Sequence, residues 1–80
     1  MSQQPLEQLR TQIDNEDIDA QHAEKIDRLK SNVQRGMEEP EYHPTLLKEL
    51  EESLIEFGDS HPRLAAAIQS AINSLSSAGI

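Results

Sequence analysis

The sequence has no cysteine and no tryptophan, and its 80 residues include one tyrosine and one phenylalanine. Without cysteine the chain can form no disulfide framework, no thiolate nucleophile and no zinc finger. One valine and two aromatic residues, with no apolar alternation over five residues, give β-strands no support. These absences exclude a disulfide-stapled protein and favour an all-α fold.

Long hydrophobic runs are also missing. Apolar residues make up 35% of the chain, and no stretch approaches the roughly 18–20 apolar residues of a transmembrane span. The start, Met1–Pro5, lacks the basic and apolar regions of a signal peptide. Because chains of this length form one domain at most, we expect a single soluble, cytoplasmic domain over residues 1–80.

Basic residues are scarce: seven lysines and arginines stand against fifteen acids, for a formal net charge of -8. Such a chain repels phosphate backbones and anionic lipid, so we expect neither nucleic acid nor a membrane as a partner. Residues 38–59 hold eight acids and only Lys48, whereas Arg63 is the sole charge from residue 60 onward. The C-terminal segment therefore has the composition of a surface that is covered.

Apolar residues recur at spacings of three and four in four segments, which predicts helices over about 3–14, 18–36, 44–57 and 62–78. Their apolar faces comprise Leu6, Leu9, Ile13; Ile18, Ile26, Leu29, Val33, Met37; Leu46, Leu47, Leu50, Leu54, Phe57; and Leu64, Ile68, Ile72, Leu75. Ile55 falls on the opposite side of its helix, where a second partner could cover it, although single exposed apolar residues are normal.

Turn and capping residues predict where these helices begin and end. The acidic run 14–17 interrupts the first pattern, so the second helix should start near Asp17 or Asp19, and Gly36 is a plausible stop. Residues 38–43 form a linker, and residues 58–60 end the third helix. Gly79 followed by Ile80, which would contact Leu75, is typical of a Schellman ending.

The predicted architecture is four short helices packed as helical hairpins or as a small bundle. About twenty sizeable apolar side chains are few for ordering this chain, which favours completing the core by homo-oligomerisation. The uncharged C-terminal helix, with its ridge of small residues, is the expected interface, through Leu64, Ala67, Ile68, Ala71, Ile72, Leu75 and Ile80. A monomeric bundle is the alternative.

Three histidines are candidates for chemistry. His22 lies on the apolar face of the second predicted helix, where it could be a pH switch, a metal ligand, or a half-buried histidine bonded to a carbonyl or to an acid across the helix seam. His43 and His61 each precede a proline, which biases them to extended backbone and suggests two helix starts. We favour the structural interpretation for all three.

Acidic residues could also hold a divalent cation together with His43. They are Glu38, Glu39, Glu41, Glu49, Glu51, Glu52 and Glu56. No calcium-binding loop motif and no histidine pair at helical spacing accompanies them, so a solvated face, or a surface for a basic protein partner, is the preferred interpretation. No base is placed beside a hydroxyl by spacing, and the glycines are isolated, so we expect no enzyme and no cofactor.

The C-terminal residues carry a family resemblance. Phe57, His61, Pro62 and Leu64 form the pattern F-x-x-x-H-P-x-L, and a small-residue helix ending in Gly79-Ile80 follows. This region resembles a family of small acidic bacterial proteins, domain of unknown function forty-four-zero-four. Members often have Glu where this chain has Gly58. The resemblance extends more weakly upstream; it implies a bacterial cytoplasmic setting and an all-α fold, and it carries over no active-site residue.

Two functional hypotheses follow. The first is a non-enzymatic helical module that self-associates through its C-terminal helix and presents the acidic middle to another protein. The second is a small regulatory protein that docks an amphipathic helix into a partner's groove. A third, less favoured, is a metal- or pH-responsive switch that uses His22 and His43.

Overall fold

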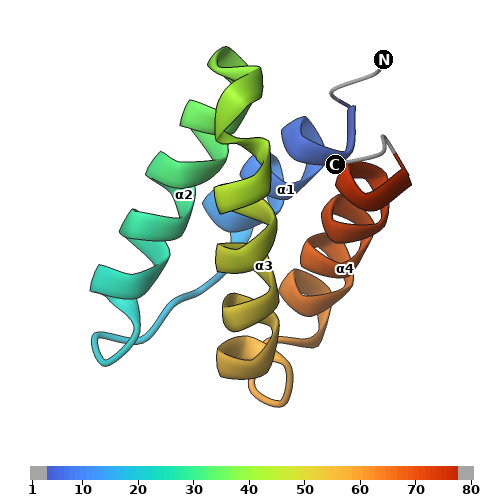
Figure 1. Cartoon of the computed structure of the whole chain (residues 1–80). Coiled ribbons are helices and arrows are strands. Elements are labelled where there is room, and N and C mark those ends of the chain that lie inside the picture. The colour runs from blue at the N-terminus through green and yellow to red at the C-terminus, as the bar shows by residue number, and fades with distance from the viewer. Residues whose placement is uncertain (1–3, 78–80) are drawn as a thin grey trace.

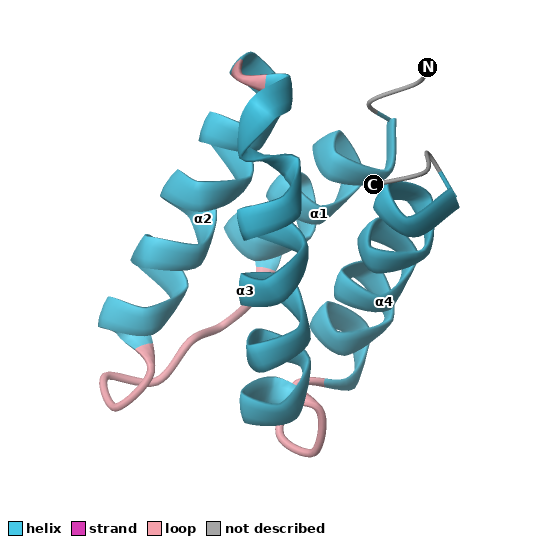
Figure 2. Ribbon diagram, viewed as in Figure 1, coloured by secondary structure: helices cyan, strands magenta, loops and turns pink. Residues whose placement is uncertain are grey.

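The computed structural model describes residues 4–77. They form four α-helices, namely α1 (Gln4–Asn15), α2 (Ala23–Glu38), α3 (His43–Phe57) and α4 (Pro62–Ser77), with a short 3₁₀ helix, η1 (Pro40–Tyr42), before α3. No strand occurs within the described range (Figure 2). The all-α prediction is therefore confirmed.

The four helices form an antiparallel bundle. Each helix packs against two others, in the cyclic order α1, α2, α3, α4, and the chain direction alternates from one helix to the next (Figure 1). The principal extents are 34 × 19 × 19 Å. This alternation brings the α1–α2 and α3–α4 connections to one end of the bundle, while the η1 connection lies at the other.

The core is a single cluster of apolar side chains contributed by all four helices. It contains Leu6, Leu9, Ile13, Ile26, Leu29, Val33, Leu46, Leu50, Phe57, Leu64, Ile68, Ala71, Ile72 and Leu75. No polar side chain is buried in the described part of the chain. The apolar face of each helix therefore finds its cover on the neighbouring helices of the same chain.

The expected interface on the C-terminal helix lies in this core. Leu64, Ile68 and Ala71 are fully buried, and Leu75 and Ile72 are 2% and 8% exposed. Ala67 packs against the cluster, and Ile80 lies outside the described residues. The absence of charge after residue 60 thus has an intramolecular explanation.

The size of the molecule agrees with a core closed by one chain. Its accessible surface is 4929 Å², against about 4900 Å² for a compact monomer of this mass. Its radius of gyration is 11.5 Å, and about 11.6 Å is typical of a folded domain of this length. One copy therefore buries as much surface as an ordinary small domain.

Helix α2 begins later than predicted, at Ala23 rather than near Asp17 or Asp19. Helix α1 has 12 residues and α2 has 16, so α1 is shorter by about 6 Å. The α1–α2 connection spans this distance as an irregular segment. It closes in a turn in which His22 N–H donates to Asp19 O at 3.1 Å. Ile18 still packs against the core.

Gly36 does not end α2, which continues to Glu38. It is a buried residue inside the helix, and a Cβ there would overlap Cδ2 of Leu46. The glycine thus serves close approach of α2 and α3. The helix ends at extended Glu39 (φ -126°, ψ 98°), the conformation favoured before Pro40.

Both His-Pro pairs mark helix starts, as predicted, and α3 ends at Phe57 before the predicted turn. His61 precedes α4 and its carbonyl accepts from Ala65 N–H at 2.9 Å. The extended backbone expected for His43 is wrong: this residue is helical (φ -55°, ψ -43°), because η1 leads directly into α3. The predicted Schellman ending lies outside the described residues.

Candidate functional site

Two histidines meet at the end of the bundle where the α1–α2 and α3–α4 connections lie together. His22 comes from the first connection and His61 from the second. We call the group formed by Glu16, Asp19, His22, Phe57 and His61 the histidine cluster. Its members are up to 45 residues apart in sequence and become neighbours because alternate connections of an antiparallel bundle share an end.

Each histidine in the cluster binds a carboxylate through the same ring nitrogen. Nδ1 of His22 donates to Oδ1 of Asp19 at 2.8 Å, and Nδ1 of His61 donates to Oε1 of Glu16 at 3.2 Å. The second oxygen of Glu16 accepts from Gln12 one turn earlier on α1. The hydrogen bond from His22, opposed in part by desolvation, holds the pKa of Asp19 below its usual value.

The rings of the cluster pack edge to face. The His22 and His61 centroids are 6.0 Å apart, and both rings contact Phe57, at 5.3 and 5.8 Å. Phe57 is 1% exposed, so the histidines stand between the core and solvent. One ring nitrogen from each histidine and one oxygen of Asp19 lie within 4.8 Å of one another, a spacing that can hold a metal ion.

The structural interpretation of two histidines is supported. His22 is partly buried beside an acid, although it precedes α2 rather than lying within it. Nε2 of His43 contacts the Gly36 carbonyl oxygen at 2.8 Å, near the opposite end of the bundle. The structure therefore pairs His22 with His61 and not with His43, the partner considered from sequence.

The topology itself held the signal that was missed. His22 and His61 directly precede the second and the fourth helix, and in an up-down bundle these two starts lie at the same end. The sequence interpretation used His61 only as a helix start.

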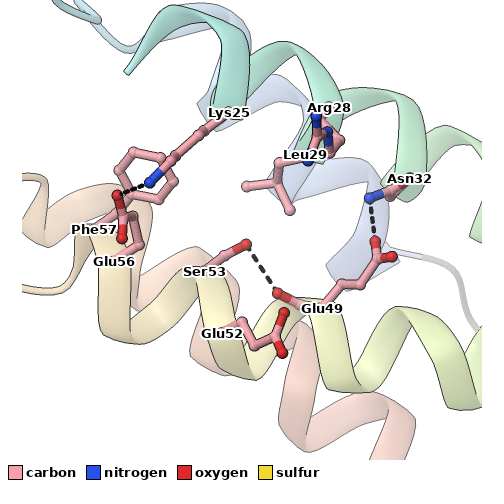
Figure 3. Close-up of a pocket in the computed structure, with 9 residues that line it drawn as sticks. All are labelled: Lys25, Arg28, Leu29, Asn32, Glu49, Glu52, Ser53, Glu56 and Phe57. Atoms are coloured by element: carbon pink, nitrogen blue, oxygen red, sulfur yellow. Dashed lines mark hydrogen bonds and ion pairs between the residues drawn. The ribbon is translucent and has the colours of Figure 1, made fainter. Parts of the chain in front are cut away.

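A groove between α2 and α3 has a volume of about 320 Å³ (Figure 3). Lys25 reaches across it to Glu56 at 2.5 Å near Phe57, and Asn32 donates to Glu49 further along. Leu29 lies between these two links. The groove is therefore bridged by polar contacts that join the helices.

The acidic residues that the sequence suggested as cation ligands do not form one cluster, and several of them bind different side chains. Glu38 accepts from Gln34, Glu39 pairs with Arg35, and Glu49 accepts from Tyr42 as well as Asn32. Burial and the Glu49 charge raise the pKa of Tyr42 above its ordinary value. Among the described residues, the group with metal-ligand spacing is Asp19, His22 and His61, rather than these acids with His43.

One exposed face of α3 combines charge with an apolar side chain. Ile55 is 85% exposed, and the exposed residues Glu51 and Glu52 lie within about one turn of it. Lys48 is exposed about two turns earlier on the same face, and exposed Asp59 follows in the turn after α3. Within the described part of the chain, none of these four charged side chains forms a hydrogen bond or an ion pair. We call these five residues the α3 strip.

No helix in the described range is both long enough and apolar enough to span a membrane. Neither a curated protein nor a solved structure matches the chain. A family model described as "Domain of unknown function (DUF4404)" matches residues 3–80. The match covers nearly the whole chain, including the segment on which the resemblance was based. The chain therefore belongs to the DUF4404 family.

Proposed function

We propose that this protein is a non-enzymatic binding module whose α3 strip docks a basic segment of another protein. The observation that carries the proposal is the 85% exposure of Ile55 among carboxylates that form no hydrogen bond or ion pair with residues 4–77. Covering an isoleucine yields roughly 1.5–3 kcal/mol. The surrounding charge would accelerate the encounter with a basic segment and orient it.

The charge of the whole chain supports this choice of partner. Of the net charge of -8, residues 38–59 carry most, with eight acids against Lys48. Four of these acids, Glu38, Glu39, Glu49 and Glu56, already bind side chains of α2 or η1. The acids of the α3 strip have no such partners among the described residues, so their charge is available to a second protein.

The α4 face plays no part in the proposal, because its apolar residues are core residues of the same chain. The alternative function, docking one amphipathic helix into a partner's groove, would require the bundle to open, because the apolar face of each helix lies in the core. Self-association stays a prediction; it would have to use other residues or exchange helices between copies.

The test is an NMR titration of the isotope-labelled full chain with a synthetic peptide of alternating lysine and leucine. We expect amide shift changes centred on the α3 strip. The variant E51K should weaken binding roughly threefold to tenfold, because it replaces an attraction by a repulsion. I55S should weaken it by a similar factor through lost apolar contact.

The matched control is E7K, which makes the same charge change on an exposed residue of α1. It should leave the affinity for the peptide almost unchanged. Equal weakening by E7K and E51K, or shift changes spread evenly over all four helices, would mean that net charge alone attracts the peptide and would overturn the proposal. Circular dichroism confirms that each variant folds.

A further inference from the structure

We infer that the histidine cluster is a binding site for a transition-metal ion of the Zn²⁺ class, with Asp19, His22 and His61 as ligands. The ligand atoms come from both connections at one end of the bundle and already lie within 4.8 Å of one another. Zn²⁺ bonds of about 2.0–2.2 Å place tetrahedral ligands roughly 3.3–3.6 Å apart. Closing the site therefore takes shifts of about 1 Å in two short connections.

The hydrogen bonds of the cluster prepare it for a cation. Metal-bound histidines usually donate their second ring N–H to a carboxylate, which fixes the ring and raises the basicity of the ligand nitrogen. Glu16 occupies this position for His61, at 3.2 Å from Nδ1, and Gln12 holds Glu16 in turn. Nε2 of His61 is thereby left as the ligand atom.

The contact between Asp19 and His22 differs in role from the contact between Glu16 and His61. At 2.8 Å its two atoms are closer than two ligands of one tetrahedral ion. A metal ion entering the cluster would replace the proton shared by this pair, and the two atoms would move apart to coordinate it. The proton of Nδ1 would then move to Nε2 of the same ring, so His22 would bind the ion as a neutral imidazole.

Partial burial of the site limits the access of bulk water to the ligand atoms. The side chains of His61 and Glu16 are each 13% exposed and that of His22 is 19% exposed, with Phe57 closing the inner side. Asp19, 55% exposed, lies on the open side. Three protein ligands and one open position suit a fourth ligand from water.

The ligand types select the class of ion. Two imidazoles and one carboxylate suit Zn²⁺ and its neighbours among the first-row transition metals, whereas Ca²⁺ and Mg²⁺ take sets of oxygen ligands. An ion here would join residues 16–22 to residues 58–61 and so clamp the α1–α2 hairpin to the α3–α4 hairpin. Metal binding would therefore stabilise the bundle without any change in its fold.

The first experiment is calorimetric titration of the untagged full chain with Zn²⁺, using Mg²⁺ as the comparison ion. We expect one Zn²⁺ per chain and no Mg²⁺ heat. The melting temperature should rise by roughly 10–20 °C when free Zn²⁺ is about 100 times its Kd. No saturable Zn²⁺ binding, or equal binding of both ions, would overturn the inference.

Variants then place the ion. H22Q and H61Q each remove one ligand and should weaken Zn²⁺ binding at least about tenfold, whereas H43Q, the same change at the other end of the bundle, should not. In the wild-type chain, Zn²⁺ should shift the ring resonances of His22 and His61 but not of His43, a readout that survives if a variant fails to fold. Equal effects on all three histidines would identify adventitious surface binding and overturn the inference.

Discussion

Gly36 is the residue on which the close packing of α2 and α3 depends most directly. It is helical, so alanine would gain about 1 kcal/mol in helix propensity. A Cβ would overlap fully buried Leu46, however, and overpacking of this kind costs about 1–3 kcal/mol. We expect G36A to lower the free energy of unfolding by about 1 kcal/mol, measured by urea denaturation.

The control for this prediction is the L46A background, which removes the overlapping atoms. There G36A should raise the stability by up to about 1 kcal/mol, since only the propensity gain remains. A stabilising effect of G36A in both backgrounds would show that the close approach is not a constraint.

The ionisation of Tyr42 can be followed by ultraviolet absorbance alone, because it is the one tyrosine of a chain without tryptophan. Burial and then the Glu49 charge raise its pKa above 10.0. The folded state therefore favours the neutral phenol; this stabilisation is complete below pH 10 and is lost as the pH rises through the folded-state pKa. In E49Q the phenolate absorbance should appear at lower pH than in the wild type.

Glu52 supplies the comparison, since it is an exposed glutamate on the same helix without a bond to Tyr42. E52Q should leave the titration of Tyr42 in place. A titration curve that E49Q and E52Q move equally would mean that net charge, rather than the contact, sets the pKa.

For single residues, the sequence predicted which side chains are exposed better than it predicted which side chains contact one another. Helical spacing put Ile55 opposite the apolar residues of α3, and Ile55 is exposed as this position predicts. The partial burial of His22 was predicted, but its acid, Asp19, lies three residues away in the same connection rather than across a helix seam. The contact of His22 with His61 was not predicted, because the meeting of two distant connections depends on how the helices pack.

The sequence predicts the number of helices correctly, but it predicts some helix ends better than others. Prolines fixed the starts of α3 and α4 within one residue. Helix α2 was misjudged at both ends, for physical reasons that local patterns do not contain. Its start comes after an irregular connection that closes in a turn at His22. Its passage through Gly36 accompanies the close approach of α3 at Leu46.

The ion pair between Lys25 and Glu56 links α2 to α3 and gives a prediction for these two elements. The Lys25 hydrogen bond and charge lower the pKa of Glu56 below 4.5. The associated stability is present above pH 4.5 and is lost as the pH falls through the lowered pKa. In K25Q we expect the pKa of Glu56 to rise toward 4.5, measured by NMR of the carboxyl carbon.

The matched substitution is K30Q, which breaks the link from α2 to Asp14 on α1 instead. It should leave the titration of Glu56 unaltered. If K25Q and K30Q shifted the pKa by the same amount, the long-range field of the chain would be responsible rather than the α2–α3 pair.

For the whole molecule, the all-α class and four-helix organisation were predictable from spacing and composition, and residue-level burial followed for most apolar positions. The C-terminal helix face was correctly predicted to be covered, but charge content does not show what covers a face, and its role as an interface between copies stays a prediction. In this bundle α1 and α3 cover it.

The substitution I68D tests that assignment, because Ile68 is fully buried. An unpaired carboxylate there costs several kcal/mol, which is comparable to the whole stability of a small domain. We expect I68D to lose its helical circular dichroism. The exposed control I55D should remain folded. A folded I68D chain with altered mass would restore the face to the role of an interface between copies.

The measurement that tests the central claim most directly is light scattering with circular dichroism on the same samples of the wild-type chain over a wide dilution series. The account predicts that a species of 9.0 kDa retains the full helical signal, because one chain completes its own core. Loss of helicity as the mass falls to 9.0 kDa, with helical species found only at higher mass, would contradict it.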